Sequence, residues 1–384
     1  MKFTDGYWSV KKEMTPLYAV EYADSRRKGD ELTIYAPAKH IAHRGDSLNL
    51  GMLTIRLSSP MEDVIKVSVV HFEGTAYKGP FAEINQTSPH VSIEETEDFI
   101  TYQSGHTKAV VDKRPNSWGI RFLDGDREMT NTSFRNMANI LNNETGRKYT
   151  VDALAIDVDE YIYGLGERFT PFVKNGQVVD MWNEDGGTAS EISYKNIPFY
   201  ITNKGYGILL DNEGDASYEI ASEKVERIQF SVEGERLDYY VINGHTPKGT
   251  IQKYAELTGK PALPPAWSFG LWLTTSFTTN YDEETTSSFI QGMADRDIPL
   301  HVFHFDCFWM EGFEWCNFVW DPKTFPDPEG MLKRYHQRGL KICVWINPYI
   351  GQKSPLFAEG MEYGYLVKKS NGDVWQTDMW QAGM

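Results

Sequence analysis

The sequence predicts a multidomain protein of β plus α/β class, with an N-terminal β-sandwich followed by the first part of a (β/α)8 barrel. Up to about residue 243, short segments that alternate apolar and polar residues are separated by turn residues, which is typical of antiparallel strands. After about residue 265, strand-like and helix-like segments alternate, which is typical of βα units around a parallel sheet. A proline-rich connector separates the two patterns.

Residues 1–245 are expected to form the β-sandwich. Several segments alternate so that one face of each strand is apolar. The last segment ends at Asn243-Gly244, which is a turn signal. The clearest segments are Leu53–Leu57, Val64–Val70, Lys108–Asp112, Ile228–Val232 and Leu237–Ile242.

Residues 246–265 are expected to form a linker. Thr250–Leu257 has the pattern of a short helix, and Gly259–Pro265 follows it with three prolines. Proline fixes φ, lacks an N–H donor and biases the preceding residue toward extended conformations. We therefore place a domain boundary in this stretch.

Residues 266–384 are expected to form about three βα units. Trp267–Leu273 is predicted to be a buried strand, and Leu300–Phe305 and Lys341–Ile346 are the next two strands. Asp282 and Asp327 are predicted to cap the intervening helices, because a carboxylate accepts hydrogen bonds from the free N–H groups at a helix start. A complete barrel takes about 250 residues, and this region supplies about half that number. We therefore expect a truncated barrel.

The charge balance bears on the class of partner. The chain has 38 basic and 54 acidic residues, for a formal net charge of -16. This charge argues against a nucleic acid or an anionic membrane as partner, because both would repel the protein. Aromatic residues make up 14% of the chain, which suits a sugar-binding protein, although such residues also fill β-rich cores.

The cysteines and the N-terminus bear on location and cofactors. The chain has an odd number of cysteines, Cys307, Cys316 and Cys343, and they form no C-x-x-C pair. Both observations argue against a disulfide framework. The N-terminus has no apolar signal segment, and no run approaches the roughly 18 apolar residues of a membrane span. We expect a cytoplasmic protein without a metal or cofactor.

The carboxyl ends of the barrel strands are the expected binding region, because barrels bind ligands there. Asp306 follows the second strand and can accept hydrogen bonds from sugar hydroxyls. The alternative for Asp306 is a turn cap. Phe277 and Trp345 follow the first and third strands, where ordinary packing is the alternative.

The motifs resemble glycoside hydrolase family 31. Two of the motifs lie in the front domain and four in the barrel, namely Tyr163–Phe169, Asn196–Tyr200, Pro264–Thr274, His304–Met310, Phe325–Gly330 and Lys341–Pro348. The resemblance is nearest to bacterial α-xylosidases and covers their N-terminal half. It implies a galactose-mutarotase-like sandwich, a catalytic (β/α)8 barrel and cleavage of α-glycosides with retention.

The resemblance also implies roles for individual residues. Asp306 matches a residue that binds hydroxyls of the sugar in the -1 subsite, and Phe277 and Trp345 match residues that line this subsite. Asp185 matches a front-domain loop that reaches over the barrel mouth. The alternative for that loop is a plain Asp-Gly turn.

The pair Cys307-Phe308 indicates the substrate. Family members that act on glucosides carry Ile-Asp here, whereas this pair resembles the one in α-xylosidases. Phe308 offers no partner to a 6-hydroxyl, and xylose lacks that group. Neutral packing variation is the alternative. The implied activity is release of α-linked xylose from xylosides or xyloglucan oligosaccharides, with an α-glucosidase or a non-catalytic carbohydrate-binding protein as alternatives.

No catalytic residue is assigned within the chain. A retaining glycosidase needs two carboxyl groups about 5–5.5 Å apart. In the family these groups follow the fourth and later strands, so we expect the chain alone to be inactive. The expected partner is an oligosaccharide or small glycoside, and a homo-oligomer is left open for the full-length protein.

Overall fold

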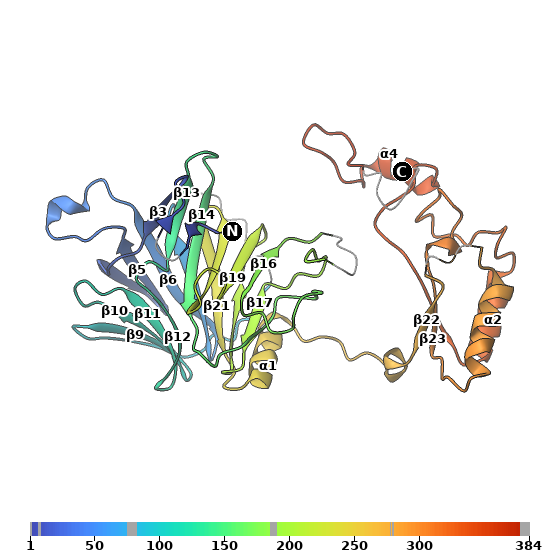
Figure 1. Ribbon diagram of the computed structural model, residues 1–384, viewed down its shortest axis with the longest axis horizontal. Helices are drawn as coiled ribbons and strands as arrows, with labels where there is room; N and C mark the ends of the chain where they lie inside the picture. The colour runs from blue at the N-terminus through green and yellow to red at the C-terminus, as the bar shows by residue number, and fades with distance from the viewer. Residues whose placement is uncertain are drawn as a thin grey trace. The chain divides into compact units, whose positions relative to one another are not determined.

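The computed structural model describes residues 2–6, 9–74, 83–184, 190–276, 278 and 280–376. The chain divides into two compact units, Met1–Pro261 and Ala262–Met384 (Figure 1). This division falls inside the range predicted to be a linker. The predicted bounds 1–245, 246–265 and 266–384 stay a prediction.

The described part of the first unit is built mainly from three antiparallel sheets. The largest runs in the order β15 (Ile162–Gly164), β17 (Phe199–Thr202), β18 (Tyr206–Leu210), β21 (Arg236–Asn243), β7 (Val64–Val70), β6 (Met52–Met61), β5 (Glu31–Pro37) and β4 (Asp24–Lys28). The second runs in the order β16 (Gln177–Met181), β19 (Ala216–Ile220), β20 (Arg227–Glu233), β14 (Lys148–Ala155), β13 (Ala138–Asn142) and β3 (Met14–Tyr18). The third runs in the order β12 (Arg127–Ser133), β11 (Gly119–Asp124), β10 (Thr107–Asp112), β9 (Phe99–Ser104) and β8 (Val91–Glu95). An antiparallel pair of short strands, β1 (Thr4–Asp5) and β2 (Ser9–Val10), and the short 3-10 helix η1 (Arg44–Ser47) also belong to the unit.

The core of the first unit lies between these sheets. In β5, Leu32, Ile34 and Ala36 are buried while the residues between them are partly exposed, which is the period-two pattern of a strand with one buried face. Apolar side chains from all three sheets join one core cluster. The predicted antiparallel β-sandwich is therefore confirmed, and its five predicted strand segments lie in β6, β7, β10, β20 and β21.

The helix α1 (Pro247–Thr258) packs on the first unit. The side chain of Thr246 caps it by accepting a hydrogen bond from the Gly249 N–H at 3.0 Å. The ring of Tyr254 stacks on Phe199 with ring centroids 4.1 Å apart, and Leu257 is fully buried. These contacts attach the helix to the eight-stranded sheet.

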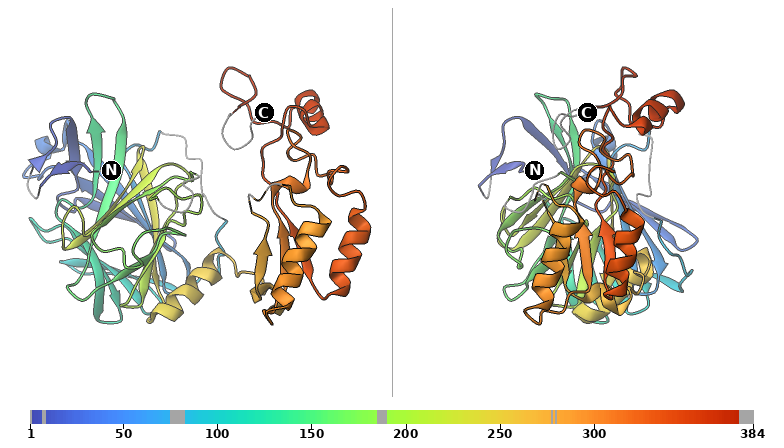
Figure 2. Two further views of the ribbon diagram at one scale, coloured as in Figure 1. Left: turned by 45° about the vertical axis from the view of Figure 1, so that its right-hand side comes forward. Right: turned by 90° about the vertical axis from the view of Figure 1, so that its right-hand side faces the viewer.

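The second unit holds a parallel sheet of β22 (Trp272–Thr274), β23 (Val302–Phe305) and β24 (Lys341–Val344). The helices α2 (Glu283–Ala294) and α3 (Pro328–Gln337) lie along one face of the sheet (Figure 2), and α4 (Pro355–Tyr363) follows β24. The predicted caps are confirmed, since Asp282 accepts from the Thr285 N–H at 2.8 Å and Asp327 from the Gly330 N–H at 3.0 Å. The predicted partial (β/α)8 barrel is confirmed. No described helix is both long and apolar enough to span a bilayer.

The predicted buried strand Trp267–Leu273 is wrong. Residues Ala266–Phe269 form a 3-10 helix, η2, and the strand begins only at Trp272. Trp267 is 39% exposed and Trp272 is 44% exposed. The carbonyl of Pro265 accepts hydrogen bonds from the N–H and the hydroxyl of Ser268, so a tight turn replaces the first part of the strand.

A buried carboxyl group connects all three large sheets of the first unit, because Asp152 lies on β14, Thr132 on β12 and Tyr239 on β21. Asp152 on β14 accepts hydrogen bonds from the Thr132 hydroxyl at 2.6 Å, the Ala153 N–H at 2.8 Å and the Tyr239 hydroxyl at 2.8 Å. Burial raises the pKa of Asp152 to about 6 from its usual 3.8, although these hydrogen bonds oppose the rise. The neutral form of Asp152 therefore persists to a higher pH in the folded state than in the unfolded chain.

We predict a specific pH dependence of stability from Asp152. Because its folded pKa lies above its unfolded pKa, the stabilisation is present below about pH 4 and is lost as the pH rises through about 6, a change of about 3 kcal/mol. Urea unfolding of the wild type and of Asp152→Asn, compared at each pH from 4 to 7, checks this, because the titration of other groups cancels. The wild type should lose stability relative to the variant across this range. A constant difference would contradict the prediction.

Candidate functional site

The face of the parallel sheet that turns away from α2 and α3 carries polar side chains. Parallel pairing places Thr274, His304 and Cys343 side by side on that face. The Thr274 hydroxyl lies 2.8 Å from Nδ1 of His304. Burial lowers the pKa of His304, which favours the neutral imidazole. On the opposite face, Phe303 and Phe305 pack against Tyr335 of α3.

Asp306 lies at the carboxyl end of β23, where the short 3-10 helix η3 (Cys307–Trp309) begins. Its carboxylate accepts a hydrogen bond from the Cys307 N–H at 2.7 Å, so Asp306 forms the turn cap that was the alternative to a binding role. Its N–H donates to the Thr275 hydroxyl at 3.0 Å, and its carbonyl accepts from the Tyr281 hydroxyl at 2.8 Å. The segment that follows β22 therefore holds the backbone of Asp306 on both sides.

The next two residues are also held firmly. Cys307 is buried, and burial, with a contribution from Asp306, raises the pKa of its thiol to about 12. The thiol is therefore neutral near pH 7 and unsuited to act as a nucleophile. The ring of Phe308 packs edge-to-face against Tyr281 and Trp315, with centroids 6.4 Å and 5.5 Å away.

Trp345 joins the same edge of the sheet. The backbone N–H of Trp345 donates to the Phe305 carbonyl at 2.8 Å, and the Trp345 carbonyl accepts from the indole N–H of Trp309 at 2.8 Å. The structure therefore brings together four of the six predicted site residues: Asp306, Cys307, Phe308 and Trp345. Asp185 and Phe277 lie outside the described residues. The predicted roles of all six residues stay predictions.

The loops after β23 and β24 are fastened to each other. The Cys316 thiol donates to the Asn347 carbonyl at 3.0 Å, and the Gly351 N–H donates to the Trp315 carbonyl at 3.1 Å. Lys353 pairs with Glu314 at 3.1 Å. These contacts limit the movement of Trp315 and therefore of the Phe308 ring that packs on it.

Three supporting residues were absent from the predicted site: Thr275, Tyr281 and Trp315. Thr275 lies at a strand end, and Tyr281 directly precedes the helix cap Asp282, so both stand next to positions that the sequence did mark. The pairing of each hydroxyl with the Asp306 peptide depends on the fold, since Tyr281 lies 25 residues away in the chain.

In the first unit, a hydrogen-bond network connects the two motifs Tyr163–Phe169 and Asn196–Tyr200. We call this network, which centres on Arg168 and Asn196, the joint. Arg168 donates hydrogen bonds to the carbonyls of Leu165 at 3.1 Å, Asp180 at 2.9 Å and Glu191 at 3.1 Å, and also to the side chain of Asn196.

Asn196 in turn donates to the carbonyls of Trp182 and Ser193, both at 2.8 Å. The joint therefore holds both sides of the segment that contains Asp185.

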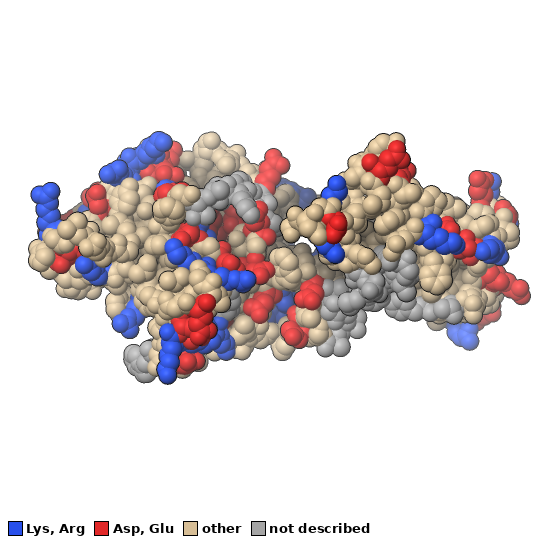
Figure 3. Space-filling view, turned by 90° about the horizontal axis from the view of Figure 1, so that it is seen from above, with Lys and Arg blue, Asp and Glu red and all other residues tan. Residues whose placement is uncertain are grey.

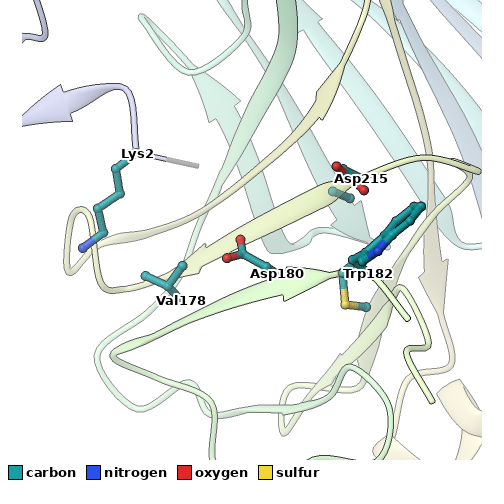
Figure 4. A pocket seen from close by; sticks show the side chains of 7 residues that line it. Lys2, Val178, Asp180, Trp182 and Asp215 are labelled. Carbon is teal, nitrogen blue, oxygen red and sulfur yellow. The ribbon is translucent and has the colours of Figure 1, made fainter. Parts of the chain in front are cut away.

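A hollow of about 480 Å³ lies beside this joint. Figure 4 shows Trp182 and Asp215 at one end of the hollow, with Asp180, Val178 and Lys2 along it. Trp182 is 60% exposed, and Asp180 accepts a hydrogen bond from the Ser217 hydroxyl at 2.6 Å. An exposed indole beside carboxylates suits the apolar face and the hydroxyls of a sugar.

The surface charges and titratable groups bear on partners and cofactors. Acidic and basic side chains are interspersed on the face shown in Figure 3 rather than gathered into an extended basic area. Within the described ranges, no three His, Cys, Asp or Glu side chains gather so that they could hold a metal ion.

The comparisons with known proteins agree with this architecture. Residues 261–384 match the family 31 glycosyl hydrolase TIM-barrel domain, and residues 54–219 match the glycosyl hydrolase 31 N-terminal galactose mutarotase-like domain. The whole chain is 53% identical to α-xylosidase XylQ of Lactiplantibacillus pentosus over 50% of that protein. It is 44% identical to an α-xylosidase of Emericella nidulans over 52% of that protein.

The chain thus spans about half the length of the curated relatives it matches. Among solved structures, the glucose complex of the Flavobacterium johnsoniae family 31 dextranase FjDex31A matches 95% of this chain and 43% of its own chain. That match has a TM-score of 0.77 at 23% identity, which supports the fold alone.

The joint in the first unit predicts a large effect of Gly166→Ala. Gly166 has φ of 91°, and an added Cβ would lie 2.1 Å from the Lys195 carbonyl oxygen. Gly176 has φ of 84° but nothing within 4 Å of an added Cβ, so Gly176→Ala is a matched control for the backbone cost alone. Urea unfolding should show a loss of about 3 kcal/mol or more for Gly166→Ala and of about 1 kcal/mol for the control. Equal losses would mean that the close approach contributes nothing.

Proposed function

The chain belongs to glycoside hydrolase family 31, and we propose that it is the N-terminal half of a retaining α-xylosidase that releases α-linked xylose from xylosides or xyloglucan oligosaccharides. The observation that carries the proposal is the pair Cys307-Phe308, held beside Asp306 at the carboxyl edge of the parallel sheet. The α-xylosidase relatives at 53% and 44% identity support it.

In this proposal, Asp306 binds the xylose hydroxyls. Its carboxylate already accepts the Cys307 N–H, and a carboxylate has about four lone-pair sites, so further donors can bind. Hydrogen bonds from hydroxyls to a charged carboxylate are short and strong. Trp345 and Phe277 are proposed to line the sugar, and Asp185 is proposed to bind the substrate as the family resemblance implies.

Phe308 provides the selectivity for xylose. Tyr281 and Trp315 restrict its ring, so the ring cannot easily move aside for a larger sugar. A glucose unit would place its 6-hydroxyl against apolar carbon, and an unpaired buried hydroxyl costs about 1–3 kcal/mol. Xylose has no such group and avoids this cost.

The carboxyl groups that carry out the reaction are proposed to lie outside these 384 residues. In a retaining reaction, a carboxylate attacks C1, the aglycone departs with a proton from a carboxylic acid, and water then releases the sugar. The described residues supply three parallel strands of the eight in a complete barrel. The 384-residue chain alone is therefore proposed to be inactive.

The cytoplasm is the proposed location. Cys307, Cys316 and Cys343 are all free thiols. A reducing compartment keeps thiols in this form.

We predict activity and selectivity as follows. A polypeptide extended to the full length of the relatives should hydrolyse p-nitrophenyl α-xyloside faster than the α-glucoside, while the 384-residue chain should hydrolyse neither.

Phe308→Asp, which supplies an acceptor for the 6-hydroxyl, should raise the ratio of kcat/KM for glucoside over xyloside by about tenfold or more. Phe134→Asp, at an exposed phenylalanine of the first unit, is the matched control and should leave the ratio unchanged.

Each contrary result has a distinct meaning. Activity of the 384-residue chain would mean that its own carboxyl groups perform the reaction. A preference of the extended wild type for glucoside would indicate an α-glucosidase. Binding of xylose without hydrolysis by the extended protein would indicate a non-catalytic carbohydrate-binding protein.

A further inference from the structure

We propose that Tyr281 is a positioning residue that sets both the reactivity and the xylose selectivity of the site without touching the sugar. This inference rests on the proposed function, because it concerns how Asp306 and Phe308 are held. Tyr281 is 1% exposed, so it can act only through the residues packed around it.

The hydroxyl of Tyr281 holds Asp306. It donates a hydrogen bond of 2.8 Å to the Asp306 carbonyl, at the point where β23 gives way to η3. The backbone N–H of Asp306 donates to the Thr275 hydroxyl at 3.0 Å. With its N–H and its carbonyl both bonded to the segment after β22, the backbone of Asp306 has little freedom to rotate. The Cys307 N–H, which donates to the Asp306 carboxylate at 2.7 Å, then orients the side chain on this fixed backbone.

The ring of Tyr281 holds Phe308. The two rings pack edge-to-face at an interplanar angle of 75°. The ring of Trp315 also packs edge-to-face against Phe308, at an interplanar angle of 71°. Tyr281 also packs against Phe305 and Phe325, with centroids 6.3 Å and 6.2 Å away. Because Tyr281 is buried among these rings, its own ring has little freedom to move, and it restricts the partly buried Phe308 that packs against it.

The position of Tyr281 is itself set by the helices. It immediately precedes Asp282, the cap of α2, so its backbone is fixed where that helix begins. Arg334 of α3 also pairs with Glu283 in the first turn of α2. The start of α2 therefore sets the backbone position of Tyr281.

The two roles of Tyr281 can be separated by substitution. Tyr281→Phe removes the hydroxyl and keeps the ring, so it should lower kcat/KM for xyloside and glucoside alike, by about tenfold, with the ratio between them unchanged. Tyr281→Leu also removes the ring, which frees Phe308 to move. It should therefore reduce the preference for xyloside over glucoside by about fivefold or more, in the direction of Phe308→Asp.

Tyr335 offers a matched control. It is also 1% exposed and hydrogen-bonded in the same core, yet its hydroxyl contacts α2 rather than Asp306. Tyr335→Phe and Tyr335→Leu should lower thermal stability as the Tyr281 variants do, without changing the preference for xyloside. Tyr335→Phe should also leave kcat/KM of the folded enzyme close to that of the wild type.

The experiment measures kcat/KM for p-nitrophenyl α-xyloside and α-glucoside on the polypeptide of the relatives' full length, for the wild type and the four variants. An unchanged preference in Tyr281→Leu, or undiminished activity in Tyr281→Phe, would overturn the inference. Should Tyr281→Leu fail to fold, the comparison of Tyr281→Phe with Tyr335→Phe still decides. A wild type that hydrolyses neither substrate would refute the proposed function itself, whereas a xyloside-selective wild type with insensitive Tyr281 variants would refute only the inference.

Discussion

The parallel pairing of β22, β23 and β24 is the constraint on which the candidate site depends. Parallel strands all end at the same edge of a sheet, so the residues that follow β22, β23 and β24 meet there. This places Thr275 and Tyr281 near enough to bond the peptide groups of Asp306, and it places Trp345 beside Trp309. If the strands shifted by one residue, the alternation of side chains would turn the polar face toward the helices and destroy the site.

The two units use their family motifs in different ways. In the first unit, the motif around Gly166 and Arg168 forms a backbone joint, in which the absent side chain of a glycine and the hydrogen bonds of an arginine hold neighbouring segments together. In the second unit, the motif around Asp306 lies at a strand end, where its side chains are proposed to bind the sugar. A motif that identifies a family can therefore serve the fold in one domain and the proposed chemistry in the other.

The sequence predicted the features that depend on residues close together in the chain. It did not predict those that depend on residues far apart in the chain. The helix caps Asp282 and Asp327 were predicted correctly, because a cap bonds to an N–H three residues away. The buried strand at Trp267–Leu273 was wrong, because an apolar run does not reveal which of its residues have neighbours to cover them. The support that Tyr281 gives to Asp306 was missed, since a tyrosine before a helix gives no sign of which carbonyl its hydroxyl will meet. The sequence placed Asp306, Cys307, Phe308 and Trp345 at one edge of the sheet because strand ends and family motifs coincide there, and their roles stay predictions.

The central claim is that xylose binds at the carboxyl edge of the parallel sheet, with its hydroxyls on Asp306 and its C5 facing Phe308. The most direct test is a crystal structure of the polypeptide at the relatives' full length, soaked with xylose. We predict a sugar whose hydroxyls lie about 2.7 Å from the Asp306 carboxylate, with the Cys307 N–H still bonded to it and the Phe308 ring against C5. An ordered sugar that makes no contact with Asp306, or that turns a hydroxyl toward Phe308, would contradict the claim.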